Sequence, residues 1–238
     1  MADTNNDRVQ KFSVDGAFSA TIGAGGTDAG ELDQPAGIAV DAVSNPMSFK
    51  LYISEEANHR ISKFDTAGNF ERMWGWGVQD GTSTLQVCSS GCQSGLSGGG
   101  EGQFNYPSGI AIDAVGNVWV VDKGNHRVQK FGPDGVFLAA WGVHGSGDGE
   151  FAFPSDLDID GSDLLYVSEG QGDRIQVFDA DGTFLGKAGS SGTSPGQLDG
   201  AQGIGLDAGL GLYVIESFND RVSKFTRRAL ENFVADRR

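Results

Sequence analysis

The sequence predicts an all-β protein built from repeated four-stranded antiparallel sheets, on three observations. An acidic residue is followed five positions later by an arginine at five places along the 238-residue chain. The intervals from Arg127 to Arg174 and from Arg174 to Arg221 are both 47 residues. Between these sites, short apolar segments alternate with turn-forming residues, which indicates one supersecondary unit copied along the chain. The five pairs are Asp3–Arg8, Glu55–Arg60, Asp122–Arg127, Glu169–Arg174 and Glu216–Arg221.

The third copy shows the predicted elements most clearly. Apolar residues alternate or run continuously over four segments, which predicts four strands. The turns between them are rich in Gly, Asn, Asp and Pro, and Gly135 suits a hairpin turn that needs a positive φ. Four strands in a unit of this length are typical of a β-propeller blade. The predicted strands are residues 109–113, 118–122, 127–131 and 136–141.

The same pattern divides the whole chain into a propeller segment, residues 1–225, and a basic C-terminal tail, residues 226–238. Residues 78–101 are mostly Gly, Ser, Gln and Thr, and we place them in a loop insert. Six blades at this period would need more residues than the chain has. We therefore expect three complete blades with a partial blade at each end, forming an arc of a six-bladed propeller whose open edges could self-associate. The blades are expected at about residues 2–23, 36–77, 107–142, 154–189 and 202–225.

The segment Tyr106–Gly142 reads YPSGIAIDAVGNVWVVDKGNHRVQKFGPDGVFLAAWG. Its Pro-x-Gly-Ile-x-x-Asp, Tyr/Trp-Val, Asn-x-Arg-Val and Asp-Gly-x-Phe elements recur in one order along the chain, and this pattern resembles the NHL repeat. The resemblance covers nearly all of the chain outside residues 78–101 and the tail. It implies a β-propeller of the kind that commonly serves as a platform for proteins or ligands. One fold hosts unrelated activities, so it does not by itself identify the function.

Charge bears on one role that the resemblance implies. Some NHL propellers bind single-stranded RNA through a basic face, because phosphate neutralisation supplies much of the affinity. This chain has 32 acidic against 17 basic residues and a net charge of −15. Nucleic-acid binding is therefore disfavoured. The chain also has no apolar run of about eighteen residues, so no membrane segment is predicted.

The acid–Arg pairs themselves predict structure rather than chemistry. A contact that recurs in every copy across the second-to-third strand hairpin is what an inter-blade contact looks like, whereas an enzyme needs asymmetry. We therefore seek function where copies differ, on the face that carries these hairpins, the blade-to-blade connections and the insert. The candidate binding residues on this face are Asp7, Asn58, His59, Asn125, His126, His144 and Asp148.

The insert is the candidate recognition element of that face, and an unselected flexible loop is the alternative. Its Cys88 and Cys92 are the only cysteines of the chain. A local disulfide or two free thiols are both compatible with this spacing, and a disulfide would favour a secreted or cell-envelope protein. The sequence otherwise leaves localisation open. The residues expected to anchor the insert are Val78, Leu85, Val87, Cys88, Cys92 and Leu96.

Two metal hypotheses come from related propellers. Peptidylglycine amidating lyases resemble this repeat type and use His-ligated zinc, and all three histidines here lie on the predicted loop face. Calcium-dependent lactonases of propeller fold need converging oxygen ligands. Asp156 and Asp158 are candidates for such a site, because they place acids where the previous copy has Gly109 and Ala111.

From these observations we predict a non-catalytic scaffold that binds a protein or small ligand through its loop face, without catalytic residues or a cofactor. One alternative is a calcium- or zinc-dependent enzyme of lyase or lactonase type. The other is the substrate-recognition part of a larger modular protein, such as a tripartite-motif ubiquitin ligase. Ligase chemistry would then reside outside this sequence, which has no RING or B-box cluster.

Overall fold

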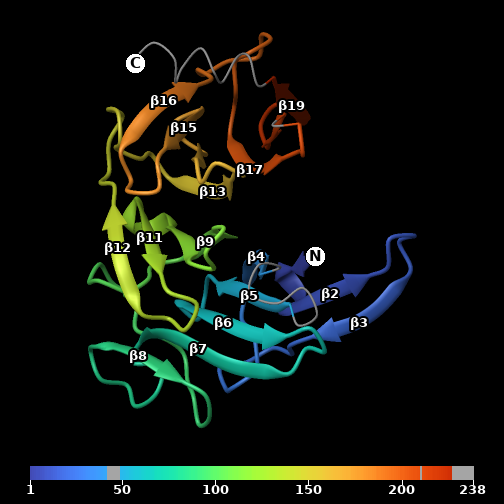
Figure 1. Cartoon of the computed structure of the whole chain (residues 1–238), viewed down its shortest axis with the longest axis vertical. Helices are drawn as coiled ribbons and strands as arrows, with labels where there is room; N and C mark the ends of the chain where they lie inside the picture. Colours follow the sequence, from blue (N-terminus) through green and yellow to red (C-terminus); the bar gives the residue numbers. More distant parts are fainter. Residues whose placement is uncertain (42–48, 210, 227–238) are drawn as a thin grey trace. The chain divides into compact units, whose positions relative to one another are not determined.

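The computed structural model describes residues 1–41, 49–209 and 211–226, and in these residues it forms five antiparallel β-sheets, one for each acid–Arg pair (Figure 1). The strands follow the predicted hairpins closely: in the third sheet β10 and β11 coincide with the predicted segments. The strands are β1 (Ala2–Asp3), β2 (Arg8–Phe12), β3 (Phe18–Ile22), β4 (Pro35–Asp41), β5 (Lys50–Glu55), β6 (Arg60–Asp65), β7 (Phe70–Trp76), β8 (Leu85–Cys88), β9 (Pro107–Ile112), β10 (Val118–Asp122), β11 (Arg127–Phe131), β12 (Phe137–Trp141), β13 (Pro154–Ile159), β14 (Leu165–Glu169), β15 (Arg174–Phe178), β16 (Phe184–Ala188), β17 (Ala201–Leu206), β18 (Leu212–Glu216) and β19 (Arg221–Phe225).

The sheets have the strand orders β1-β2-β3, β4-β5-β6-β7-β8, β12-β11-β10-β9, β13-β14-β15-β16 and β17-β18-β19. This confirms the predicted all-β propeller architecture. It corrects the predicted division into three complete blades with a partial blade at each end of a six-bladed arc, because the described residues form five blade sheets. The sheets at the two ends have three strands each: Ala2–Asp3 pairs with β2 as a short strand in the first, and β17, β18 and β19 form the last.

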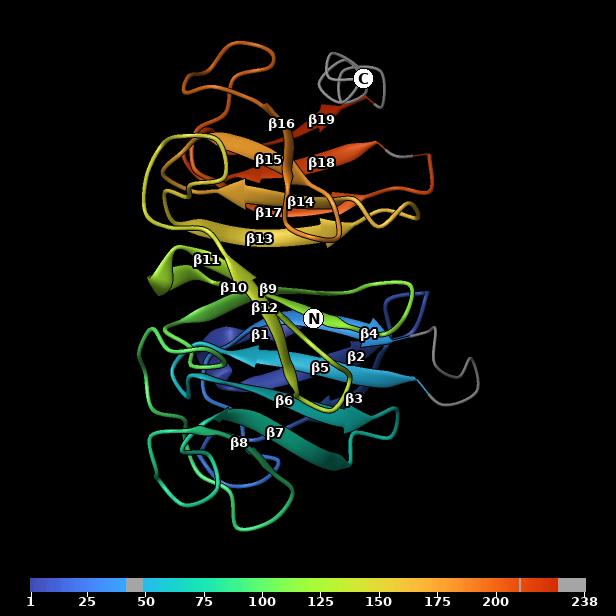
Figure 2. The same cartoon turned by 60° about the vertical axis from the view of Figure 1, so that its left-hand side comes forward.

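The chain divides into two compact units, which are described separately. The first comprises residues 1–125 and 129–140, and the second comprises residues 126–128 and 141–238. In the first unit β4 and β9, the first strands of successive sheets, are in contact. In the second unit β13 and β17 are in the same relation, and Figure 2 shows them side by side.

Within each unit, apolar residues fill the space between successive sheets. In the first unit Tyr52, Trp74 and Phe131 belong to one buried cluster. In the second unit Tyr166, Val177 and Val214 belong to another. Each connection between sheets also contributes one fully buried apolar residue, and such burial is the main stabilising contribution to the fold. These connection residues are Leu32, Phe104, Phe151 and Leu198.

The insert differs from the predicted loop. Its residues Leu85–Cys88 form β8, which pairs with β7 and extends the second sheet to five strands. A small core of Met73, Val78 and the two cysteines lies beneath it. Residues 227–238 of the predicted basic tail lie outside the described residues. Within the described part of the chain, no helix is long and apolar enough to span a membrane.

Candidate binding surface

Register explains the five-residue interval between acid and arginine. Glu169 and Arg174 are directly opposite each other at the end of the β14–β15 hairpin, and Glu55 and Arg60 have the same relation in β5–β6. The four residues between them form the hairpin loop. The pair therefore lies at the loop end of its hairpin, next to the segment that connects one sheet to another.

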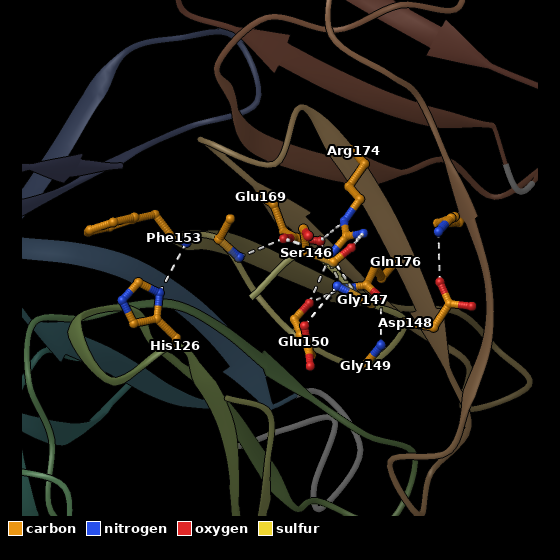
Figure 3. A network of polar contacts seen from close by, with 12 residues as sticks. His126, Ser146, Gly147, Asp148, Gly149, Glu150, Phe153, Glu169, Arg174 and Gln176 are labelled. Atoms are coloured by element: carbon orange, nitrogen blue, oxygen red, sulfur yellow. Dashed lines mark hydrogen bonds and ion pairs between the residues drawn. The ribbon is translucent and has the colours of Figure 1, made fainter. Parts of the chain in front are cut away.

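In the second unit Arg174 holds this connection in place (Figure 3). Its Nε donates to Glu169 Oε1 at 2.5 Å, and its guanidinium also donates to the carbonyl oxygens of Ser146, Gly147 and Glu150 at 2.6, 3.1 and 2.9 Å. Glu169 Oε2 accepts the N–H of Ala152 at 2.7 Å. One buried ion pair thus fixes the backbone on both sides of the connection, and charge-assisted bonds of this kind are the stronger class.

The first unit repeats the arrangement with Arg60, which is fully buried together with Glu55. Arg60 donates to the carbonyl oxygens of Thr27 and Glu31, and also to Gln93 in the insert at 3.0 Å. In the fifth sheet Arg221 donates to Glu216 at 2.7 Å and to two carbonyl oxygens of its own connection. The described pairs therefore hold connections in place.

The residue before four of the five arginines has a second repeated role. It adopts a left-handed φ, 49° at His59 and 53° at His126, and its side chain accepts a backbone N–H from the next connection. His59 Nδ1 accepts the N–H of Tyr106 at 3.3 Å, and His126 Nδ1 accepts that of Phe153 at 3.2 Å. An aspartate does the same elsewhere, through Asp7 to Gln34 at 2.9 Å and Asp173 to Gly200 at 2.8 Å.

An accepting Nδ1 requires the neutral imidazole. Burial lowers the pKa of His59, and burial followed by the electrostatic effect of the neighbouring His144 lowers the pKa of His126. Both shifts favour the neutral form that the hydrogen bonds need. Neither imidazole is therefore free to act as a zinc ligand through Nδ1 while this bond is made.

The predicted asparagines also serve the connections. Asn58 Nδ2 donates to Glu55 Oε2 at 2.7 Å and to the carbonyl oxygen of Gly26 at 3.0 Å. Asn125 Nδ2 donates to Asp122 Oδ2 at 2.9 Å and to the carbonyl oxygen of Gly98. Of the seven candidate binding residues, the five that lie in hairpin loops thus have their side chains engaged within the fold.

The other two candidates, His144 and Asp148, lie in the connection that Arg174 holds. His144 is exposed, and its ring lies 4.4 Å from that of His126. Asp148 is exposed and forms an ion pair with Lys187 at 2.7 Å. These side chains expose polar groups on a backbone segment whose carbonyl oxygens accept hydrogen bonds from Arg174.

In the insert, Cys88 and Cys92 form a disulfide. Val78 and both cysteines are buried, whereas Val87 and Leu96 expose 41% and 37% of their surface. Leu85 packs against the core of the second sheet. The backbone N–H of Leu96 donates to Trp76, and the neighbouring Gly95 donates to Asn58, so the insert rejoins the connection next to the β5–β6 hairpin.

The two acids considered as calcium ligands bridge successive sheets instead. Asp156 Oδ2 accepts the N–H of Ile204 at 3.0 Å, and Asp158 Oδ2 accepts that of Leu206 at 2.8 Å. Both donors lie on β17. Burial raises the pKa of Asp156 to about 6 and also raises the pKa of Asp158. In the described residues, no three His, Cys, Asp or Glu side chains are grouped so that they could hold a metal ion.

Sequence reasoning missed the aromatic residues whose backbone N–H groups donate to the histidines. Tyr106 and Phe153 both precede a proline and both adopt a left-handed φ, 52° and 53°. Tyr106 is 51% exposed, and its ring contacts that of His59 at 5.2 Å. A comparison of copies would have found them, because each directly precedes the proline that begins a first strand, Pro107 or Pro154.

The NHL repeat family profile matches residues 104–131. Mouse NHL repeat-containing protein 3 is 50% identical over 48 residues, which are 20% of this chain and 14% of that protein. The mouse E3 ubiquitin-protein ligase TRIM71 is 37% identical over 60 residues, which are 25% of this chain and 7% of that protein. The chain thus matches only a small part of the length of these relatives.

Among solved structures, a gluconolactonase from Xanthomonas campestris, XC5397, superposes with a TM-score of 0.58 at 19% identity. The superposition covers 94% of this chain and 70% of the other. At this identity the likeness concerns the fold alone. The match over residues 104–131, together with the repeated sheets, shows that the chain carries NHL repeat sequence in a β-propeller fold.

Proposed function

We propose that the chain is a non-catalytic scaffold that binds a protein or small ligand through its connection segments. The observation that supports this proposal is that the histidines and aspartates considered for catalysis or metal binding are hydrogen-bonded within the fold. His59, His126, Asp156 and Asp158 each accept a backbone N–H within the fold. A general acid or base must instead reach a substrate proton.

The exposed side chains of the connections are suited to recognition. In the second unit Val143 is 61% exposed beside His144. In the first unit Tyr106 is 51% exposed and Leu96 of the insert is 37% exposed. Apolar and aromatic side chains on a backbone that is already ordered lose little conformational freedom on binding, which favours affinity. Each unit thus supplies its own candidate contact residues.

The similarity to part of a ubiquitin ligase supports a narrower form of the same proposal. In that form the chain would be the substrate-recognition part of a larger modular protein. The similarity covers 60 residues. It assigns no ligase chemistry to this chain. The prediction is a protein partner whose binding depends on the connection residues.

A cation-dependent enzyme is a second candidate, and the raised pKa of Asp156 is the observation that favours it. Perturbed carboxylates are common at active sites, although structural contacts also perturb them. Elemental analysis of protein purified without chelator tests this candidate. Near-stoichiometric calcium or zinc that is lost in Asp158→Ala would favour the enzyme over the scaffold.

The scaffold proposal is tested by affinity capture with two surface variants and a control. His144→Ala with Val143→Ser changes the second unit, and Tyr106→Ala changes the first. Asp181→Ala changes an exposed hairpin on β15–β16 that lies away from the connections. We expect a captured partner to be lost with one surface variant and kept with the control. A partner set that is identical for all four proteins would contradict the proposal.

A further inference from the structure

Two connections of the second unit are held by the same kind of hydrogen bond from different side chains. His126 Nδ1 accepts the N–H of Phe153 at 3.2 Å (Figure 3). One repeat later, Asp173 accepts the N–H of Gly200 at 2.8 Å, and in both cases acceptor and donor are 27 residues apart. The role is thus performed by a ring that titrates near neutral pH in one connection and by a carboxylate in the other.

A second histidine distinguishes the connection 142–153. The exposed ring of His144 has its centroid 4.4 Å from that of half-buried His126, and the ring of Phe153 contacts the same imidazole at 4.6 Å. The counterpart of His144 is Ser191, since each forms the isolated β-bridge of its connection. His126 and His144, named the histidine pair from here on, therefore bring two titratable rings into contact.

The bond to Phe153 exists only while the imidazole of His126 is neutral. A proton on Nδ1 would face the Phe153 N–H, because the accepting nitrogen must carry a lone pair. Phe153 has a φ of 53°, in the left-handed region that a bulky residue keeps only when its surroundings hold it there. When both rings of the histidine pair are protonated, two positive charges also lie side by side. Protonation therefore removes a bond that holds Phe153 and adds repulsion next to it.

The other charged groups of this region already have partners of their own. They belong to the connection 142–153, to the hairpin that carries His126 and to the β14–β15 hairpin. These residues are Asp122, Lys123, Arg127, Asp148, Glu150, Glu169, Asp173 and Arg174. Burial and then the electrostatic effect of His144 lower the pKa of His126. The bond is therefore kept at neutral pH, and its contribution is lost as pH falls below the ordinary histidine pKa of 6.5.

Asp156 titrates in the same range with the opposite sign. It follows Phe153 closely in the chain, on β13, and burial raises its pKa to about 6. Acidification therefore favours the folded state at Asp156, whereas it disfavours the closed connection at His126. A loss of order near Phe153 on acidification thus has the sign expected of His126.

We propose that the histidine pair makes the connection 142–153 sensitive to pH, so that it is ordered at neutral pH and released on acidification. The connection carries Val143 and His144, the contact residues of the second unit in the proposed function. Binding through them is therefore lost at acid pH. This consequence rests on the proposed scaffold function, whereas the release of the connection does not.

Hydrogen exchange of single backbone amides, measured by NMR on the full chain at pH 7.5 and pH 5, tests the release. Phe153 reports on the bond to the histidine pair, and Gly145, which donates within the same connection, reports on its remainder. Gly200 and Gly192 are the counterpart amides of the connection that Asp173 holds. They serve as internal controls, because a carboxylate acceptor keeps its lone pairs at both pH values.

The protection factor, which corrects for the intrinsic exchange rate, should fall by about tenfold for Phe153 and Gly145 between pH 7.5 and pH 5. The ceiling is about thirtyfold, because His126 in the open connection has the ordinary pKa of 6.5. Gly200 and Gly192 should change by less than about twofold.

His126→Asp is the matched variant, because it supplies the carboxylate acceptor that Asp173 provides in the other connection. It should keep Phe153 protected at both pH values. His144→Ser supplies the counterpart residue Ser191 and removes one cause of the lowered pKa of His126, so the fall in protection should become smaller. Circular dichroism at both pH values verifies that each variant remains folded.

Equal protection of Phe153 at the two pH values would overturn the proposal, and so would a fall that His126→Asp preserves. A fall shared by Gly200 and Gly192 would indicate general acid unfolding and would overturn it as well. A fall at Phe153 without one at Gly145 would mean that the bond breaks while the connection stays ordered, which overturns the release.

Partner binding separates this proposal from the scaffold function. A partner captured at pH 7.5 should elute at pH 5 from the wild-type chain and stay bound to His126→Asp. Retention of the partner by both proteins at pH 5 would overturn the pH dependence of binding. Failure to capture any partner would count against the scaffold function alone, because the exchange measurements are made on the free chain.

Discussion

Replacing Asp156 by asparagine is expected to stabilise the protein at neutral and alkaline pH. Its carboxylate accepts the N–H groups of Ile204 at 3.0 Å and Leu157 at 2.9 Å, yet burial raises its pKa to about 6, and the charge of Asp158 raises it further. Between about pH 4 and pH 6 the folded state therefore retains a proton that the unfolded state has released. Stability falls as pH rises through this window and stays lower above it.

The size of the effect follows from the shift. A change of about two pKa units corresponds to about 3 kcal/mol in the free energy of unfolding. Asp156 keeps partial exposure, and asparagine has one oxygen where aspartate has two, so we expect a net gain of about 1–2 kcal/mol at pH 8. At pH 4.5 the wild-type carboxyl is protonated, and the gain should disappear.

Urea unfolding at pH 4.5, 6 and 8 measures this trend, with Asp207→Asn as the control. Asp207 accepts two backbone N–H groups and forms an ion pair with Lys224. These contacts lower its pKa to about 2. Its replacement should therefore destabilise the protein at pH 8, with the opposite sign. If Asp156→Asn lowers stability equally at all three pH values, hydrogen bonding rather than desolvation governs this site and the reasoning is wrong.

Three further predictions concern the rest of the fold. Arg60→Met should lower the free energy of unfolding by about 3–5 kcal/mol, because it leaves Glu55 buried without its partner. Arg8→Met changes a partly exposed pair and should lower the free energy of unfolding by less than about 1 kcal/mol. Urea unfolding compares the two variants. His59→Asp should reduce the loss of stability between pH 7 and pH 5, because a lowered histidine pKa removes stability as pH falls below its unfolded value; an unchanged pH profile would contradict the Nδ1 assignment. Reducing the Cys88–Cys92 disulfide should destabilise the insert by about 2 kcal/mol and expose β8 to limited proteolysis, and Cys88→Ser should reproduce the cleavage without reductant.

The fold was predictable because the repeat supplies the same information several times. Each copy carries its own turn residues, apolar alternation and acid–Arg interval, so one ambiguous strand is resolved by its counterparts. The insert lacks that redundancy. Its strand β8 depends on pairing with β7 and on a small core that includes Met73, residues outside the insert itself. A segment whose structure is fixed by tertiary contacts cannot be assigned from local pattern alone.

The candidate site was harder to predict because polar residues in hairpin loops have two competing uses. Asn58 and His59 looked like exposed recognition residues, since loops commonly carry function. Their actual partners, Gly26 and Tyr106, lie 32 residues before and 47 residues after them. The clue available in the sequence was substitution between copies. Asp7 and Asp173 occupy the position of His59, and the property that all three share is a hydrogen-bond acceptor.

This shared property changes how variation between copies should be interpreted. A repeat position that alternates between histidine and aspartate need not mark a specialised site, because either side chain can accept the same backbone N–H. The lysines Lys63, Lys130 and Lys224 show the same principle at another position, since each stacks on the ring of its neighbouring second strand, whether that ring belongs to a tyrosine or a tryptophan. In a repeat protein, the physical role that the copies share therefore decides whether a substitution between them is structural.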